Sequence, residues 1–146
     1  HVTRQISLTK PPQMIVKNWG VFRFEFDGEM LVGTANDSAD YDLKEYKQLI
    51  KFIQENFATE NILMLFDISE HHVSFSKEAL EYSASSQEIV KLKKAQAFVV
   101  QYLPTLLLFK FFVNVLKPKS SVKIFKNKTN ALNWLQNYRA AVNISA

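Results

Sequence analysis

The first part of the chain alternates apolar and polar side chains and then changes to a spacing of three and four residues. Residues 21–26, Val-Phe-Arg-Phe-Glu-Phe, have the two-residue period of a strand with one buried face. Asp27-Gly28 is a turn sequence before an apolar run at 30–32, so residues 21–34 are predicted to form a hairpin. From Asp42 onward the spacing indicates a helix whose apolar face carries Leu43, Tyr46, Leu49, Ile50, Ile53 and Phe57.

The rest of the chain alternates short apolar runs, which predict strands, with longer amphipathic stretches, which predict helices. In order, these are a strand at 62–66, a helix from Ser74 or Ser76 to about Lys93, a strand at 95–100, a helix at 104–116, a strand at 121–125 and a helix after Asn127. Strands that alternate with helices favour right-handed crossovers and parallel pairing. The predicted fold is therefore α/β: a single-layer mixed, mainly parallel sheet with an N-terminal β-hairpin and four helices.

The length of 146 residues fits one domain. Residues 1–12 lack periodicity and end in Lys-Pro-Pro, so they are expected to form an extended N-terminal arm, and residues 13–146 a single domain. The apolar runs and stripes predict a core that contains Phe66, Phe98, Phe125 and Trp134.

Three strand-then-helix stretches carry a resemblance to a known family: 65–68 with 75–79, 95–100 with 109–118, and 122–125 with 131–135. They resemble the STAS/SEC14-like (anti-sigma-factor-antagonist-like) domains of bacteria, particularly an uncharacterised group common in Bacteroidetes. The resemblance implies the fold predicted above. It also implies regulatory binding, either partner switching by phosphorylation, as in anti-sigma-factor antagonists, or apolar-ligand binding, as in the SEC14 branch.

Antagonists that switch by phosphorylation carry Asp-Ser-Ser-Gly or a similar loop before the helix that follows the central strand. Here residues 69–77 read Ser-Glu-His-His-Val-Ser-Phe-Ser-Lys, without the glycine or the paired serines. Ser74 and Ser76 are the phosphorylation candidates, because a helix N-terminus stabilises a phosphate. The alternative is that one of them is an ordinary helix N-cap.

Charge is unevenly distributed along the chain. Residues 1–90 hold eight basic and fourteen acidic side chains, a net charge of −6, whereas residues 91–146 hold ten basic side chains and no acid. The two halves either offset each other in one fold or leave a basic face for an anionic partner. Nucleic acid is not the expected partner, because Arg139 is the only arginine in the basic half and no known nucleic-acid motif occurs.

The sequence contains no recognisable catalytic machinery, so the protein is not expected to be an enzyme. There is no cysteine, no glycine-rich phosphate loop and no Gly-x-Ser-x-Gly elbow. His71 and His72 are adjacent in a predicted loop, which is not a recognised metal-ligand spacing. We therefore expect no catalytic residue, no metal site and no cofactor.

The helix predicted at 104–116 is apolar nearly all the way round. One sheet face covers only part of such a helix, so Leu107, Leu108, Phe111 and Phe112 are the candidates for a partner or ligand surface. About thirteen residues are too few for a transmembrane span, which needs about twenty. The part of this helix that the sheet leaves exposed is then covered by other helices of the chain, by a second copy of the protein, or by an apolar ligand or membrane surface.

Together these features predict a cytoplasmic, non-catalytic regulatory or interaction module that forms a homodimer. The alternative is a carrier or sensor of an apolar or anionic lipid-like ligand.

Overall fold

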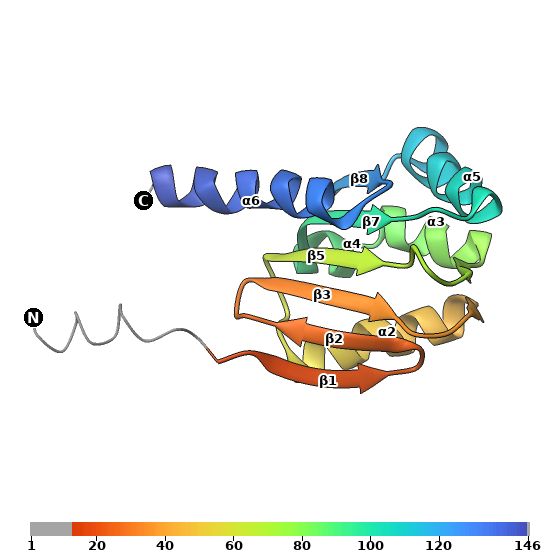
Figure 1. Ribbon diagram of the computed structural model, residues 1–146, viewed down its shortest axis with the longest axis horizontal. Helices are drawn as coiled ribbons and strands as arrows, with labels where there is room; N and C mark the ends of the chain where they lie inside the picture. The colour runs from red at the N-terminus through yellow and green to blue at the C-terminus, as the bar shows by residue number, and fades with distance from the viewer. Residues whose placement is uncertain (1–12, 146) are drawn as a thin grey trace, which may run out of the picture.

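The computed structural model describes residues 13–145, with side chains described as far as residue 139. Its main sheet has the strand order β1-β2-β3-β5-β7-β8 (Figure 1). The strands are β1 (Ile15–Trp19), β2 (Phe22–Phe26), β3 (Met30–Ala35), β5 (Ile62–Asp67), β7 (Lys93–Val99) and β8 (Ser121–Phe125). The first three pair antiparallel and the last four pair parallel, which confirms the mixed, mainly parallel sheet.

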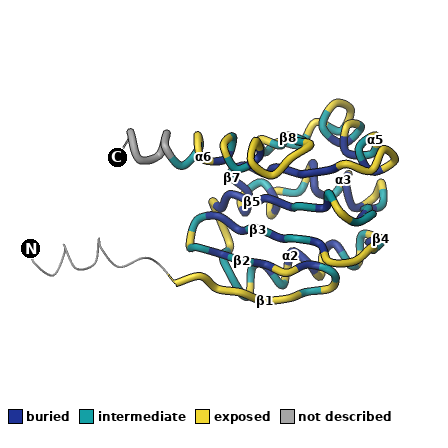
Figure 2. The backbone as a smooth tube through the Cα atoms, viewed as in Figure 1, coloured by how far each residue is buried: buried dark blue, intermediate teal, exposed yellow. Residues whose placement is uncertain are grey.

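The predicted hairpin is β2–β3, and β1 extends it to an antiparallel meander of three strands. Asp27 closes the β2–β3 turn because its Oδ1 accepts hydrogen bonds from the backbone N–H groups of Glu29 and Met30. Strand β1 forms one edge of the sheet and is exposed along nearly its whole length (Figure 2). The arm predicted for residues 1–12 lies outside the described residues.

The described residues contain five α-helices and a π-helical turn, where the sequence predicted four helices. They are α2 (Leu43–Asn56), α3 (Lys77–Ser85), α4 (Gln87–Leu92), α5 (Leu103–Phe111), η1 (Phe112–Leu116) and α6 (Lys128–Ser145). The helix predicted from Ser74 or Ser76 to Lys93 is interrupted because Ser86 adopts an extended conformation, with ψ 129°, between α3 and α4. The helix predicted at 104–116 changes from α to π geometry at Phe112.

The helices cover the two sheet faces unequally. Helices α2, α3, α4 and α5 pack with the phenylalanines of β2, β5 and β7 in the larger core. Helix α6 packs on the opposite face against β5, β7 and β8, in a smaller cluster that includes Leu63, Ala97 and Leu135 (Figure 1). No helix within residues 13–145 is both long enough and apolar enough to cross a membrane.

The predicted core is confirmed on the larger side and wrong on the smaller side. Phe66 and Phe98 are buried, as expected. Phe125 and Trp134 are only half-buried, with their ring centroids 5.7 Å apart. The physical reason is that α6 is the only described helix on their face of the sheet, so no further element covers them.

A second, two-stranded sheet was not predicted. Strands β4 (Ala39–Tyr41) and β6 (Val73–Phe75) pair in parallel beside the main sheet. Residues 36–40 read Asn-Asp-Ser-Ala-Asp, and a three-residue strand among them is too short to show a period. The small sheet ties the segment before α2 to the segment before α3.

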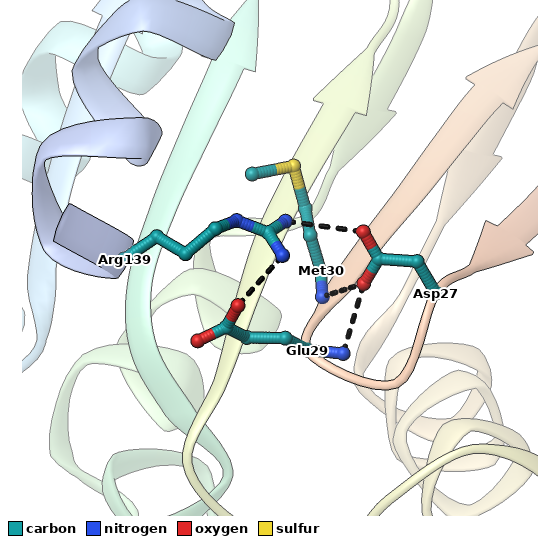
Figure 3. Close-up of polar contacts among 4 residues, drawn as sticks. All are labelled: Asp27, Glu29, Met30 and Arg139. Atoms are coloured by element: carbon teal, nitrogen blue, oxygen red, sulfur yellow. Dashed lines mark hydrogen bonds and ion pairs between the residues drawn. The ribbon is translucent and has the colours of Figure 1, made fainter. Parts of the chain in front are cut away.

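Helix α6 is tied to the β2–β3 turn by Arg139 (Figure 3). Its guanidinium donates to Glu29 Oε1 at 2.6 Å and to Asp27 Oδ2 at 3.1 Å. Burial alone would raise the pKa of Asp27. The N–H groups of Met30 and Glu29, together with Arg139, outweigh burial and hold that pKa below its ordinary value.

Candidate functional site

The segment α5–η1 presents different residues to the core and to solvent. Pro104 lies in the first turn of α5, where its missing N–H costs no hydrogen bond. Lys117, with φ 51°, adopts the left-handed conformation that ends η1. The π-helical geometry of η1 is notable because such turns are rare and frequently occur at functional sites.

The inward side of this segment consists of Thr105, Phe109 and Phe112, all buried. The ring of Phe109 lies 4.3 Å from that of Phe98 on β7, measured between centroids. Phe112 had been expected on a partner or ligand surface. Its burial excludes it from any surface that a protein partner contacts, because Phe112 packs against the sheet.

The outward side carries an apolar residue at every fourth position, namely Leu103, Leu107, Phe111 and Val115. We call these four residues the outer stripe. Leu103 is 64% exposed, Leu107 56% and Val115 61%, whereas Phe111 is half-buried beside the Lys77 ammonium. Of the other candidates, Leu108 is half-buried next to the stripe. The segment is therefore apolar on both sides, as its composition predicted.

A second feature is a lysine inside the larger core. Lys93 is only 4% exposed, and no carboxylate among residues 13–139 forms an ion pair with it. Its Nζ donates to Ser83 Oγ at 3.2 Å, and the same oxygen accepts a hydrogen bond from the Tyr46 hydroxyl at 2.9 Å. Burial lowers the pKa of Lys93 to about 7, and burial raises the pKa of Tyr46 above its ordinary value.

A β-bulge turns Lys93 towards the core. Ile62 on β5 pairs with Lys93, but the next residue, Leu63, pairs with Ala95, so Lys94 is the extra residue of the bulge. Without it, regular alternation would place Lys93 on the α6 side of the sheet with Ala95. The bulge instead places Lys93 on the same side as Gln96. Bulges of this kind re-aim side chains and are over-represented next to active sites.

Lys93 lines a small internal space that we call the Lys93 chamber. Its polar wall consists of Tyr46, Ser83, Lys93 and Gln96. Its apolar wall consists of Ile50, Met64, Phe66, Phe75, Leu80, Phe98, Phe109 and Phe112. The free space inside the chamber is about 10 Å³, which is room for roughly one water molecule. Gln96 Oε1 is buried and has no hydrogen-bond partner among the described residues.

The polar residues of the chamber were not identified from the sequence. Lys91, Lys93 and Lys94 lie close together in the sequence, and Ser83 shares the helical spacing of Ala79. A lysine that flanks an apolar strand in the sequence is usually exposed to solvent. Only the bulge, which the sequence does not reveal, distinguishes Lys93 from its neighbours.

A polar cluster contains His72 from the loop before β6, Thr105 from the first turn of α5, Asp40 from β4 and Ser74 from β6. His72 Nδ1 lies 2.9 Å from Thr105 Oγ1, and His72 Nε2 lies 4.0 Å from Asp40 Oδ1, which also accepts from Ser74 Oγ. Hydroxyl, imidazole and carboxylate follow in the order of a nucleophilic triad. However, Thr105 is 1% exposed, so no substrate reaches its hydroxyl. The cluster links α5 to the small β4–β6 sheet and is a poor catalytic candidate.

The two phosphorylation candidates occupy different settings. Ser76 is the N-cap of α3, because its Oγ accepts from the backbone N–H of Ala79 at 3.1 Å. Ser74 lies in β6 and donates to Asp40. Within residues 13–145, no group of three or more His, Asp or Glu side chains is arranged to hold a metal ion. Phosphorylation at either serine stays a prediction.

A wide surface hollow of about 690 Å³ lies along α2 beside the start of α3. Its wall includes Lys44, Lys47, Lys51 and Glu78, all exposed. Exposed, solvated charges of both signs form no defined binding geometry. This hollow is therefore a weaker candidate than the outer stripe or the Lys93 chamber.

Comparison with known proteins shows the family. The model of a domain of unknown function (DUF7793) matches residues 24–139. The chain belongs to this family. No curated protein matches it significantly.

Among solved structures, the chain is similar to an uncharacterised protein from the DUF3478 family with a SpoIIAA-like fold, from Shewanella loihica PV-4. The two are 20% identical, with a TM-score of 0.48, over 84% of this chain and 92% of that chain. A likeness this distant carries no argument about function, and the grouping with Bacteroidetes proteins stays a prediction.

Proposed function

We propose that this protein is a non-catalytic interaction module that self-associates through the outer stripe of α5–η1. The observation that carries the proposal is the exposure of Leu103, Leu107 and Val115 on one side of a single helical segment. Isolated exposed leucines are ordinary, but a continuous apolar stripe marks an interaction surface. Removing such side chains from water on association is favourable, and the stripe offers four of them on each copy.

A second copy of the chain is the occupant that the stripe fits best. Two stripes placed antiparallel match Leu103 of one copy with Val115 of the other, and Leu107 with Phe111. The contact is then symmetric, as in the homodimers that are the commonest soluble assemblies. Lys110 is exposed beside the stripe and keeps its ammonium in solvent at the rim of such a contact.

Sedimentation velocity at tens of micromolar tests this proposal. The wild-type chain is expected to sediment as a dimer, and Leu107→Glu as a folded monomer, because a carboxylate in the contact has no partner to offset its desolvation. Gln48→Glu, which adds the same charge to an exposed position on α2, is the matched control and should remain dimeric. A monomeric wild-type protein, or a Leu107→Glu variant that stays dimeric with unchanged circular dichroism, would refute the proposal.

A further inference from the structure

The polar wall of the Lys93 chamber contains hydrogen-bonding groups that the described residues leave unmatched. Gln96 Oε1 is buried and accepts no hydrogen bond from any described residue, Lys93 included. Protonated Lys93 has three N–H donors, and its contact with Ser83 Oγ uses one of them. Because buried polar groups are hydrogen-bonded in nearly all folded proteins, the carbonyl oxygen and the ammonium each require a further partner.

The Ser83 hydroxyl is a third unmatched group. Its oxygen accepts from the Tyr46 hydroxyl at 2.9 Å and from Lys93 Nζ at 3.2 Å, which occupies both of its lone pairs. The hydrogen of the Ser83 hydroxyl therefore still needs an acceptor. The polar wall thus offers an N–H of Lys93, the O–H of Ser83 and the carbonyl oxygen of Gln96 to one occupant.

We propose that the Lys93 chamber holds one internal water molecule, which accepts from Lys93 Nζ and Ser83 Oγ and donates to Gln96 Oε1. The free space of about 10 Å³ fits one water without any movement of the walls. Three hydrogen bonds is the usual number for a buried water. The inference does not depend on association through the outer stripe.

The apolar wall determines how long this water stays. Phe109 and Phe112 belong to that wall and are buried, so the chamber is closed on the side of α5–η1. A purely apolar cavity of this kind stays dry, because water inside it has no polar partner. Here the polar wall supplies the partners and the apolar wall separates them from solvent. The water therefore exchanges only when the structure opens locally.

The water gives Lys93 a partner in both of its protonation states. A water molecule donates as well as accepts, so it accepts from the ammonium and donates to the lone pair of the neutral amine. It carries no charge, so it lessens the cost of burying the ammonium without cancelling it. Lys93 can then bind and release a proton inside a closed core, and burial is the cause that sets its pKa at about 7.

The other elements around the chamber add no charge to it. Tyr46 of α2 is the second titratable group of the lining, and burial raises its pKa above the ordinary value, so it stays protonated. Tyr82 and Glu88 act on Tyr46 from outside the lining. The residues that α3, β5, β6, α5 and η1 contribute are neutral. The proton that the chamber binds near neutral pH is therefore that of Lys93.

Oxygen-17 magnetic relaxation dispersion of water compares the number of internal water molecules between variants. Lys93→Met is expected to reduce this number by one per chain, because it removes a donor and leaves an apolar space. Gln96→Leu should do the same, because a side chain of similar size removes the acceptor. Lys94→Met changes the neighbouring, half-exposed bulge residue and should keep the number found for the wild type.

The titration of Lys93 is a second readout. The chemical shift of its side-chain nitrogen, followed by NMR from pH 5 to 10, reports its proton affinity. Gln96→Leu is expected to lower this affinity at least about tenfold, because the ammonium loses the water that accepts its hydrogen bond. A crystal structure of the wild type should show density for one water within hydrogen-bond distance of Lys93 Nζ and Gln96 Oε1.

Three results would overturn the inference. The wild-type crystal shows no density in the chamber. Lys93→Met and Gln96→Leu, with unchanged circular dichroism, keep the number of internal waters found for the wild type. Gln96→Leu leaves the proton affinity of Lys93 unchanged, so no water held by Gln96 stabilises the ammonium. If Gln96→Leu does not fold, the comparison of Lys93→Met with Lys94→Met decides the question.

Discussion

The Tyr46 hydroxyl donates a hydrogen bond to Ser83 Oγ at 2.9 Å, and this bond joins α2 to α3 inside the core. Both residues are buried. The same serine oxygen accepts from Lys93, so one hydroxyl connects two helices and a strand that are far apart in the sequence. The bond accounts for a polar residue on the inner face of α3, where Ala79 and Ala84 are its buried neighbours.

Tyr46→Phe is expected to lower the free energy of unfolding by about 1–2 kcal/mol, because it removes a donor from a buried hydroxyl without changing the packed volume much. Urea unfolding followed by circular dichroism measures the change. Tyr82→Phe is the matched control: its hydroxyl donates to Glu88 at the surface, so the change should be within about 0.5 kcal/mol. Equal losses in the two variants would mean that the Tyr46–Ser83 bond has no special weight.

Ser76→Ala is expected to destabilise the protein by about 1 kcal/mol, since it removes the N-cap of α3. Ser76→Asp should keep most of the stability, because aspartate is an equally good cap and its charge suits the helix N-terminus. Ser74→Ala removes only an exposed hydroxyl–carboxylate contact and should cost less than about 0.5 kcal/mol. If Ser74→Ala is the costlier of the two alanine variants, the assignment of the cap is wrong.

The order of the main elements was predictable because each strand or helix buries its own stripe of residues. The alternation at 21–26 and the apolar run at 62–66 indicate which side chains face the core. Strands β2 and β5 occupy these positions. Strands β4 and β6 were missed because three residues show no period. The break between α3 and α4 was missed because Ser86 is compatible with either a helix or an extended cap.

The site was less predictable than the fold. The apolar excess at 104–116 indicated an interaction surface, but the division between Phe112 inside and Leu107 outside depends on how the segment rotates against the sheet. Lys93 gave no signal, because one extra residue in a bulge decides which face of the sheet a side chain occupies. Registers of this kind are set by tertiary pairing and not by local pattern.

Arg139→Met tests the link between α6 and the β2–β3 turn. The arginine donates to Glu29 and Asp27 in a partly buried setting, so its loss is expected to cost about 1–2 kcal/mol at neutral pH. Arg23→Met is the control, because Arg23 pairs with Glu25 on the surface, and it should cost less than about 0.5 kcal/mol.

The pH dependence of the Arg139→Met effect has a defined sign. The pKa of Asp27 is lowered on folding, so its contribution is present above its unfolded pKa of 3.8 and is lost as pH falls through the lower folded value. The difference in unfolding free energy between wild type and Arg139→Met should therefore shrink below about pH 4. A difference that stays constant down to pH 2 would show that Arg139 acts through packing and not through charge.

Lys93→Met is expected to stabilise the protein at neutral pH. An unpaired ammonium in an apolar core is disfavoured, whereas methionine has a similar length and no charge. The folded-state pKa of Lys93 is about 7, below its unfolded value of 10.5, so the unfolded chain binds more protons between these two pH values. Wild-type stability should therefore rise with pH from about 7 to 10, by roughly 4 kcal/mol from this group.

Lys93→Met lacks this titration. Its gain in unfolding free energy over the wild type should therefore be full at and below about pH 7 and should shrink steadily towards pH 10. Urea midpoints at pH 6, 7, 8, 9 and 10 give the comparison. Lys94→Met serves as the control, because Lys94 is half-exposed and its change should alter neither the midpoint at pH 7 nor the slope with pH. If Lys93→Met destabilises the protein at every pH by the same amount, the ammonium of Lys93 has a partner that offsets its burial, and the chamber does not hold an uncompensated cation.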